Sequence, residues 1–458
     1  MIKEKVSMLR SGQLTAAENM QNFLKVIGEK DEQVNAFIHV NSNAVNEATA
    51  VDEKIKSGKA GRLAGLAIAI KSVISVKDMP VTCASQTLEN HIGTFDADVV
   101  ARIKAEDGII IGMTNMDEFC CGNTGETSAF GPTNNPAAPG IIPGGTSSGS
   151  AAAVAAGMCD IALGTDTGGS VRNPASHCGV FGFKPSYGRI SRYGLVDMGM
   201  SLEGVGILCN DAYGIALMME VVAGQSVYDA TTLDSEVPEY SRDLSAPKKL
   251  HIGLSREMQA LTTDERIRIL IEASIKKLAK SLNAEIKDIK LKYVDLAVQA
   301  YYPIVYVEFF SATRKFDGRK YGKKIEDACG EEVLRRILGG REISRAEYRG
   351  TYYRKALKAK KLIEQDFRRA FDDVDIILTA VTPNVPQRIG EKISDPKVLY
   401  AQDALTAPAY LAGICGGVVN AGTIDGIPIG LQILGPGLGE QVVLKVMHSF
   451  WGIKNAGA

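Results

Sequence analysis

Apolar residues in the first part of the chain recur with the spacing of an α-helix. Between residues 11 and 56 one face of the pattern is apolar and the other polar, with apolar positions at Ala17, Met20, Phe23, Leu24 and Ile27. A period of 3.6 residues is typical of amphipathic helices. We therefore expect two helices in this segment and a helical layer over residues 1–60.

After residue 60 the pattern changes to short β-type or buried apolar runs separated by helical stretches. The runs lie at 66–70, 99–100, 109–111 and 161–163, and the helical stretches at 98–106 and 150–156. Alternation of strands and helices predicts an α/β sheet. We expect this sheet to form the core of the molecule over residues 61–290.

The remaining chain divides into a charged helical part and a second sheet-like part. Residues 291–372 have helical spacing and many arginines and lysines, which predicts an inserted helical lobe. Strand-like segments return within residues 373–458, at 374–378, 416–421 and 427–433. We expect them to rejoin the first sheet, so residues 1–458 form a single domain.

Composition excludes several classes of protein. The 458 residues are 45% hydrophobic and 23% charged, as in an average soluble protein, and the longest apolar run is too short to span a bilayer. The first residues mix both charge signs and lack the apolar core of a secretory signal, so we expect a cytoplasmic protein without membrane contact. A formal net charge of −1 gives no general attraction to nucleic acid.

Cysteine and histidine spacing predicts no metal site. The eight cysteines form no C-x-x-C motif, and the five histidines have no H-E-x-x-H or comparable spacing. The cysteines are expected to be free thiols.

Two glycine-rich segments, 143–150 and 164–174, enclose an alanine-rich stretch and carry several hydroxyl groups. Gly168 and Gly169 directly precede Ser170, and glycines let successive backbone N–H groups converge on one point. Thr167, Gly168 and Gly169 are therefore a candidate oxyanion hole, with Ser170 as a candidate nucleophile. Such loops also serve as plain turns or anion cradles, so the pattern by itself leaves these alternatives open.

A hydroxyl nucleophile needs a base, and the chain offers Lys71 directly after the apolar run 66–70. Burial disfavours the ammonium form, so a buried lysine can accept a proton, as in Ser-Lys hydrolases. His177 is the histidine near the glycine-rich loops, and Cys178 follows it. Adjacent side chains rarely point at each other, so Cys178 is better interpreted as a small buried residue than as half of a Cys-His pair.

Together with both glycine-rich loops, residues 65–71, 116–119 and 126–136 resemble the amidase signature family. The resemblance covers most of the chain and implies the amidase signature fold, a central mixed β-sheet covered by helices on both faces. It implies Ser170 as the acyl-forming nucleophile, Lys71 as the base and a bridging hydroxyl directly after Gly144-Gly145. That residue is Thr146, where the family pattern has serine. Thr146 keeps the family's spacing to Ser170, and Ser147 is the alternative.

Within that family, residues 114–119, 191–196 and 348–366 are similar to the A subunits of glutamyl-tRNA(Gln)/aspartyl-tRNA(Asn) amidotransferases. This resemblance implies a glutaminase that supplies ammonia for Glu-tRNA(Gln) and/or Asp-tRNA(Asn). It implies that Arg336 and Asp403 bind the α-carboxylate and α-ammonium of glutamine and that Tyr301 lines the pocket. Without the resemblance, Arg336 would be interpreted as a solvated surface residue and Asp403 as a helix cap.

The same resemblance implies partners. Two further subunits, of B and C type, are expected, and charged tRNA is expected to bind mainly through the partner. We expect no cofactor in this chain and ATP with Mg²⁺ in the partner subunit, since the chain has no G-x-x-x-x-G-K-[ST] motif.

Two other functions remain open from the sequence. A free-standing amidase acting on small amides would be fully active in isolation, whereas the glutaminase of an amidotransferase is expected to be stimulated by its partners. A nucleic-acid-binding module built on the basic run 335–369 would bind RNA in a salt-sensitive way.

Overall fold

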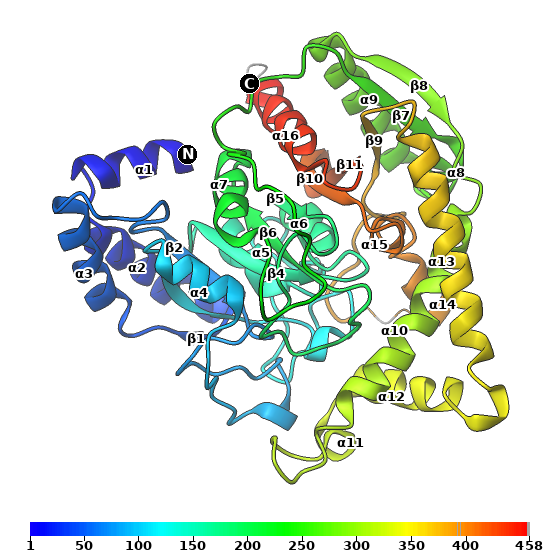
Figure 1. The fold of residues 1–458 in the computed structure, drawn as a ribbon, viewed down its shortest axis with the longest axis horizontal. Coiled ribbons are helices and arrows are strands. Elements are labelled where there is room, and N and C mark those ends of the chain that lie inside the picture. Colours follow the sequence, from blue (N-terminus) through cyan, green and yellow to red (C-terminus); the bar gives the residue numbers. More distant parts are fainter. Residues whose placement is uncertain (392, 394, 456–458) are drawn as a thin grey trace.

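The core of the protein is one mixed sheet of eleven strands (Figure 1). The computed structural model describes residues 1–391, 393 and 395–455. The strand order is β1-β3-β2-β4-β6-β5-β10-β11-β9-β7-β8. The strands are β1 Phe37–Val40, β2 Ala67–Lys71, β3 Ile109–Thr114, β4 Ile161–Asp166, β5 Phe181–Lys184, β6 Gly204–Cys209, β7 His251–Ser255, β8 Glu285–Ile289, β9 Ile376–Ala380, β10 Cys415–Ile424 and β11 Ile427–Gly435.

The described chain also forms sixteen α-helices and four short 3₁₀ helices. The α-helices are α1 Ile2–Ser11, α2 Ala16–Val34, α3 Ala44–Lys56, α4 Asp98–Ala105, α5 Ser148–Ala155, α6 Arg172–Cys178, α7 Ala212–Val222, α8 Arg256–Ala260, α9 Glu265–Leu282, α10 Ala297–Thr313, α11 Ile325–Ala328, α12 Glu331–Ile343, α13 Thr351–Ala370, α14 Pro396–Ala401, α15 Ala407–Leu411 and α16 Glu440–Asn455. The 3₁₀ helices are η1 Gln86–Leu88, η2 Glu118–Cys120, η3 Val294–Leu296 and η4 Ala346–Tyr348.

Strand directions make the sheet mixed. β2 pairs in parallel with both β3 and β4, whereas β4 pairs antiparallel with β6 and β10 antiparallel with β5 and β11. Every residue of β2 is buried, which explains its unbroken apolar run, because a central parallel strand is covered on both faces. The predicted α/β fold with a mixed sheet is confirmed.

Helices cover both faces of this sheet. Neighbouring residues of a strand point to opposite faces. A Cβ built on Gly416 of β10 would come within 3.9 Å of the Arg172 side chain of α6, and one built on Gly417 would meet Met447 of α16. α6 and α16 therefore lie on opposite faces, as Figure 1 also indicates.

The N-terminal layer contains the two expected helices and two further elements. α2 begins with a capping box, in which the Thr15 side chain accepts from the Glu18 N–H while the Glu18 carboxylate accepts from the Thr15 N–H. α3 is the second expected helix. α1 and the edge strand β1 were not predicted. Residues 99–100, assigned from sequence to a β-type or buried run, lie in α4 and are buried there.

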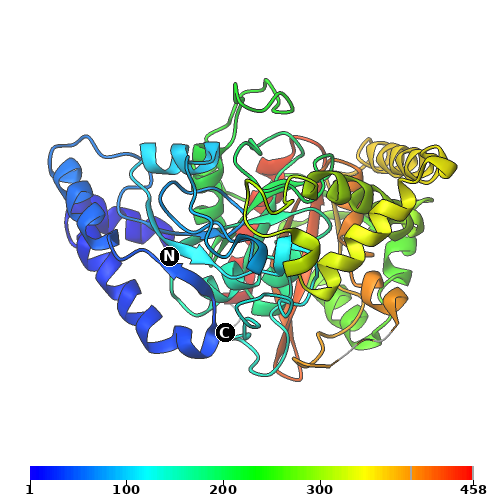
Figure 2. The ribbon, with the colours of Figure 1, turned by 90° about the horizontal axis from the view of Figure 1, so that it is seen from below.

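Helices α10, α12 and α13 pack together in the segment predicted to be a helical lobe. Figures 1 and 2 place them at the end of the molecule opposite α1–α3. Strands β9, β10 and β11 follow this lobe in sequence and extend the sheet beyond β5. Within the described residues no helix combines the length and the apolar character needed to cross a membrane.

Candidate active site

The side chain of Lys71 lies at the end of β2 and is fully buried. Its Nζ donates to the Thr146 Oγ1 at 2.7 Å and to the Thr165 Oγ1 at 2.9 Å. β2 and β4 are parallel neighbours, so the carboxyl ends of both strands meet at this edge of the sheet. The lysine amine is therefore held between one hydroxyl from the first glycine-rich loop and one from β4.

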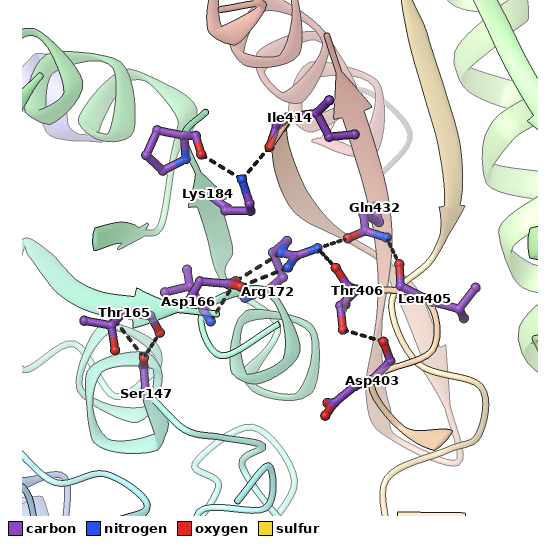
Figure 3. Close-up of polar contacts among 12 residues, drawn as sticks. Ser147, Thr165, Asp166, Arg172, Lys184, Asp403, Leu405, Thr406, Ile414 and Gln432 are labelled. Atoms are coloured by element: carbon purple, nitrogen blue, oxygen red, sulfur yellow. Dashed lines mark hydrogen bonds and ion pairs between the residues drawn. The ribbon is translucent and has the colours of Figure 1, made fainter. Parts of the chain in front are cut away.

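Thr146 makes hydrogen bonds through its backbone as well as through its side chain. The Gly145–Thr146 peptide bond is cis, and the Thr146 carbonyl accepts from the Asp117 N–H at 3.1 Å. The neighbouring Ser147 points elsewhere: its Oγ donates to the Thr165 carbonyl at 3.1 Å and accepts from the Thr165 N–H at 3.3 Å (Figure 3). The geometry therefore favours Thr146 over Ser147 as the hydroxyl next to the lysine.

Ser170 lies on the second glycine-rich loop, which is tied to the first. The Ser147 N–H donates to the Ser170 carbonyl at 3.0 Å, so the two loops share a backbone hydrogen bond. The side chain of Ser170 is 9% exposed, and its hydroxyl makes no hydrogen bond to another described residue. The structure thus places Lys71 in contact with Thr146. Ser170 lies on the adjoining loop, and its hydroxyl has no hydrogen-bond partner among the described residues.

Backbone N–H groups collect directly before and at Ser170. Among the described residues, none of the N–H groups of residues 167–170 donates a hydrogen bond. The loop lies against other elements: a Cβ on Gly168 would come within 2.7 Å of the Tyr301 hydroxyl, and Gly169 has a φ of +145° and lies against Thr406. Both positions need glycine, because a side chain would collide or be strained. Such unpartnered N–H groups can stabilise an oxyanion.

Asp166 and Arg172 form a fully buried ion pair that holds this loop from behind (Figure 3). The Arg172 Nε and Nη2 donate to the two carboxylate oxygens at 3.0 and 2.9 Å, and the N–H groups of Val171 and Arg172 donate to the same carboxylate. Burial opposes ionisation of Asp166, but the Arg172 charge and these hydrogen bonds keep the pKa of Asp166 below its usual value.

Arg172 also connects the nucleophile loop to the segment that carries Asp403. Its Nη1 donates to the Thr406 carbonyl and to the Gln432 Oε1, both at 2.7 Å, and the Gln432 Nε2 donates to the Leu405 carbonyl at 2.9 Å (Figure 3). The Thr406 Oγ1 in turn donates to the Asp403 carbonyl at 3.4 Å. One buried network therefore positions both regions relative to each other.

Asp403, Arg336 and Tyr302 form a cluster next to this network. The Tyr302 hydroxyl donates to the Asp403 carboxylate at 2.6 Å, and the Arg336 guanidinium lies over the Tyr302 ring, 5.7 Å from its centroid. Arg336 is buried, and its Nε donates to Glu332 at 3.0 Å. Burial raises the pKa of Asp403 to about 6. This cluster therefore contains one cation and one carboxylate of raised pKa.

A cleft of about 650 Å³ opens beside this cluster. Its described walls include Asn123, Thr124, Tyr302, Arg336 and Tyr400. It runs between the start of α12 and the loop that follows η2, so a small substrate can reach the cation from solvent.

Neither a metal site nor a Cys-His pair is found in the part of the chain that the structure describes. No group of three or more His, Cys, Asp or Glu side chains there is arranged to hold a metal ion. The Cys178 thiol donates to the Pro143 carbonyl, and burial raises its pKa far from the range of a reactive thiolate. Burial also lowers the pKa of His177 to about 3, so its ring is neutral.

Comparison with known proteins identifies the family. The family model described as Amidase matches residues 18–444. The chain belongs to the amidase family. This membership marks the protein as an enzyme of the amidase type.

Named relatives of this amidase cover it almost end to end. The A subunit of the glutamyl-tRNA(Gln) amidotransferase of Methanothermobacter thermautotrophicus is 52% identical over 448 residues, covering 97% of each chain. The protein of the same name from Methanobrevibacter smithii is 49% identical over 451 residues, covering 98% of each chain. The crystal structure of the protein of that name from Thermotoga maritima matches with a TM-score of 0.81 and 35% identity, covering 95% of this chain and 94% of that one.

Several residues that shape the site of this amidase were not predicted from its sequence. Thr165 is a second partner of the lysine amine, and Tyr302, next to the predicted Tyr301, is the tyrosine that donates to Asp403. Asp166 and Arg172 belong to the second glycine-rich segment, but their pairing was not predicted either. Two opposite charges six residues apart were the available signal, and that spacing does not by itself separate a buried pair from a surface one.

Proposed function

We propose that this amidase is the glutamine-hydrolysing A subunit of a tRNA-dependent amidotransferase. The observation that carries the proposal is the nearly full-length likeness, at about half identity, to relatives that bear the name of the A subunit of glutamyl-tRNA(Gln) amidotransferase. The ammonia released from glutamine would amidate Glu-tRNA(Gln) and/or Asp-tRNA(Asn). Because charged tRNA is used in translation, we expect the complex to work in the cytoplasm.

We propose that glutamine binds where the cleft meets the cluster of Arg336 and Asp403. Its α-carboxylate would pair with Arg336 and its α-ammonium with Asp403, while Tyr301 lines the side of the pocket next to Gly168. The side-chain amide would then reach toward Ser170. The hydrogen bond from Tyr302 and the charge of Arg336 both favour the ionised form of Asp403, which the substrate ammonium requires.

Acylation would use Lys71 as the base. The amine takes the Thr146 hydroxyl proton as Thr146 takes the proton of Ser170, whose Oγ bonds to the amide carbon. N–H groups of residues 167–170 stabilise the negative oxygen that forms, and their lack of other partners among the described residues supports this role. The proton returns through the same hydroxyl to the amide nitrogen, the C–N bond breaks, and ammonia leaves a glutamyl ester on Ser170.

Deacylation repeats these steps with water as the nucleophile. Water loses a proton to the Thr146–Lys71 pair and attacks the ester carbonyl, and the proton finally returns to Ser170 as glutamate leaves. Every proton transferred in both steps thus moves among glutamine, water and the chain's own side chains, and we expect this chain to need no cofactor.

The remaining chemistry belongs to the partners. We propose two further subunits, of B and C type, of which one activates the tRNA-borne carboxylate with ATP and Mg²⁺ and receives the ammonia. Charged tRNA would bind mainly through that partner.

The test is covalent trapping together with activity measurements. A glutamine-mimicking electrophile should add to Ser170 alone, as located by mass analysis of peptides, and free glutamine should compete with the labelling. Labelling elsewhere, or none, would refute the proposal. Glutamine hydrolysis should be weak for the isolated chain and rise when the other two subunits are added; full activity in isolation would favour a free-standing amidase of small amides.

The third possibility, RNA binding through residues 335–369, has its own measurement. Tight and salt-sensitive RNA affinity of the isolated chain would support it. We expect no such affinity, because three arginines of this run are paired with carboxylates. Glu332 forms ion pairs with Arg335 and Arg336, and Glu342 and Glu347 form ion pairs with Arg345.

A further inference from the structure

A short segment without helix or strand, residues 198–203, lies between the two parts of the proposed site. The Met198 Sδ accepts a hydrogen bond from the Arg336 Nη1 at 3.8 Å. A Cβ built on the next residue, Gly199, would come within 3.5 Å of the Thr167 Cγ2. The segment therefore contacts both the arginine proposed to bind the substrate carboxylate and the loop proposed to stabilise the oxyanion.

Two buried carboxyl groups hold this segment. The Glu203 Oε2 accepts from the Met198 N–H at 3.0 Å. Glu308 of α10 accepts from the N–H and the hydroxyl of Ser201, at 2.9 and 2.5 Å, and from the Tyr353 hydroxyl of α13 at 2.9 Å. Glu203 is 2% and Glu308 9% exposed. Side chains rather than a backbone ladder therefore hold the segment in place.

Glu203 is poorly suited to a role in stability. Its Oε1 is buried without a hydrogen-bond partner, and the residue forms no ion pair within the described chain. Burial raises the pKa of Glu203 to about 7, so at neutral pH a large share of it is the uncharged acid. A buried carboxyl group with one unpaired oxygen costs folding free energy that an apolar residue would not cost. What the side chain provides in return is its one hydrogen bond, to the Met198 N–H.

Met198 gives Arg336 a partner that leaves the arginine charge available. The Arg336 Nε donates to Glu332 at 3.0 Å and the Nη1 to the Met198 sulfur, while no described residue accepts from the Nη2. A thioether is a neutral and weak acceptor. It orients the guanidinium plane without competing with a carboxylate, which pairs best with two parallel N–H groups. Arg336 lines the cleft, so a carboxylate there can reach its remaining N–H groups.

We propose that Glu203 is a positioning residue for substrate binding: it holds Met198 so that the sulfur orients the Arg336 guanidinium toward the carboxylate of the substrate. This role rests on the proposed function, in which that group is the α-carboxylate of glutamine. Glu203 and Met198 act through Arg336 and take no part in breaking bonds. Together they favour amides that carry a carboxylate over uncharged amides.

The first test is the steady-state kinetics of glutamine hydrolysis by the assembled complex. Glu203→Leu removes the acceptor of the Met198 N–H. We expect KM for glutamine to rise about tenfold, the effect of one lost hydrogen bond, while kcat stays within about twofold of the wild type. Glu203→Gln keeps an acceptor of the same reach and should restore KM to near the wild-type value. A fall in kcat with KM unchanged would overturn the proposal.

A pair of electrophiles separates the positioning of Arg336 from a general loosening of the site. One is the glutamine-mimicking electrophile, and the other is its α-carboxamide analogue, which has no carboxylate. Below saturation, Glu203→Leu should slow labelling of Ser170 by the first about tenfold and leave the rate with the second unchanged. Equal slowing with both probes would show a role that does not involve the substrate carboxylate, and the proposal would fall.

Two further variants cover the case in which Glu203→Leu does not fold. Met198→Leu keeps the size of the side chain and removes the sulfur acceptor, so KM should rise in the same direction; a wild-type KM in this variant would refute the proposal. Asp211→Leu is the matched control, because Asp211 is a buried carboxylate at the other end of β6 that accepts from the Ile2 and Gly214 N–H groups. KM should stay at the wild-type value there, and an equal rise would assign the effect to lost stability instead.

Methionine-methyl NMR of the full chain tests the geometry without reference to activity. Met198→Leu identifies the Met198 signal among the thirteen methionines. This signal should shift in Glu203→Leu and in Arg336→Lys and keep its position in Glu203→Gln, and an unmoved signal in Glu203→Leu would overturn the proposal. If the wild-type complex neither labels at Ser170 nor hydrolyses glutamine, the proposed function fails, whereas the methyl signal still decides whether Glu203 places Met198 against Arg336.

Discussion

The Nζ of Lys71 lies 2.7 Å from the Oγ1 of Thr146, and both side chains are fully buried. The residue in contact with the amine is thus a threonine, whose extra methyl restricts its χ1 rotation compared with serine. Ser147, the other hydroxyl of the loop, is bonded to the backbone of Thr165. The proposed relay therefore depends on one hydroxyl that the surrounding structure holds in place.

Removing that hydroxyl tests the relay. Thr146→Val keeps the shape of the side chain, and we expect kcat for glutamine to fall about 100- to 10,000-fold, the usual contribution of a proton-transfer group. The measurement is steady-state ammonia release by the assembled complex.

Thr146→Ser is the matched control for this loss. It keeps the hydroxyl and removes only the methyl, so activity should stay within about tenfold of the wild type. Turnover of Thr146→Val equal to that of Thr146→Ser would rule out the relay role of residue 146.

Replacing the amine separates chemistry from folding. Lys71→Met removes the base but keeps a long apolar side chain in a fully buried position, so the protein should fold with a free energy of unfolding close to that of the wild type or higher. Labelling of Ser170 by the electrophile should fall at least about 100-fold. The two measurements are urea unfolding and the labelling rate, and undiminished labelling would exclude Lys71 as the base.

From the raised pKa of Asp403 we predict that glutamine binding depends on pH. Its pKa is raised to about 6, and the substrate ammonium needs the carboxylate, so KM for glutamine should rise as the pH falls through 6. Asp403→Asn should raise KM at neutral pH and remove this pH dependence. A KM that is flat between about pH 5 and 8 in the wild type would contradict the assignment.

The raised pKa of Asp403 also predicts the direction in which folding stability changes with pH. The ordinary pKa is 3.8 and the folded value about 6, so the folded state loses stability as the pH rises between these values, by on the order of 2–3 kcal/mol. Asp403→Asn should remove this loss. The difference in the free energy of unfolding, variant minus wild type, should therefore be larger at neutral pH than at acid pH. The exposed Asp372→Asn is the control and should leave the pH profile unchanged.

Breaking the Asp166–Arg172 pair should destabilise the whole protein. Arg172→Met leaves the buried Asp166 carboxylate without its cation, and we expect a loss of about 3–5 kcal/mol in urea unfolding. Adding Asp166→Asn to Arg172→Met removes the unpaired charge and should recover part of that loss. Arg335→Met, at a half-exposed side chain, should change stability by less than about 1 kcal/mol.

Local pattern was enough to predict the elements nearest the site. The unbroken apolar run before Lys71 predicted a buried strand, and β2 is that strand. The alanine-rich stretch between the two glycine-rich loops predicted a helix, and α5 lies there. By contrast, β5 and β6 were missed, because both contain glycines that break the alternation of strand residues.

The local sequence pattern could not predict contacts between residues that are far apart in the sequence. Tyr301 and Tyr302 are neighbours in sequence, and only the turn of α10 decides that one contacts Gly168 and the other donates to Asp403. Arg172 reaches Gln432 and Thr406 across the sheet, more than two hundred positions away. A single sequence carries no signal for contacts of that range.

What the chain alone determined was which chemistry is available: a lysine at the end of an apolar run, hydroxyls in glycine-rich loops and a serine after two glycines. These are local features, set by the backbone freedom of glycine and by the burial of apolar side chains. The tertiary structure decided which hydroxyl meets the amine, because parallel pairing of β2 with β4 brings Lys71 between Thr146 and Thr165 and leaves Ser147 bonded to the strand.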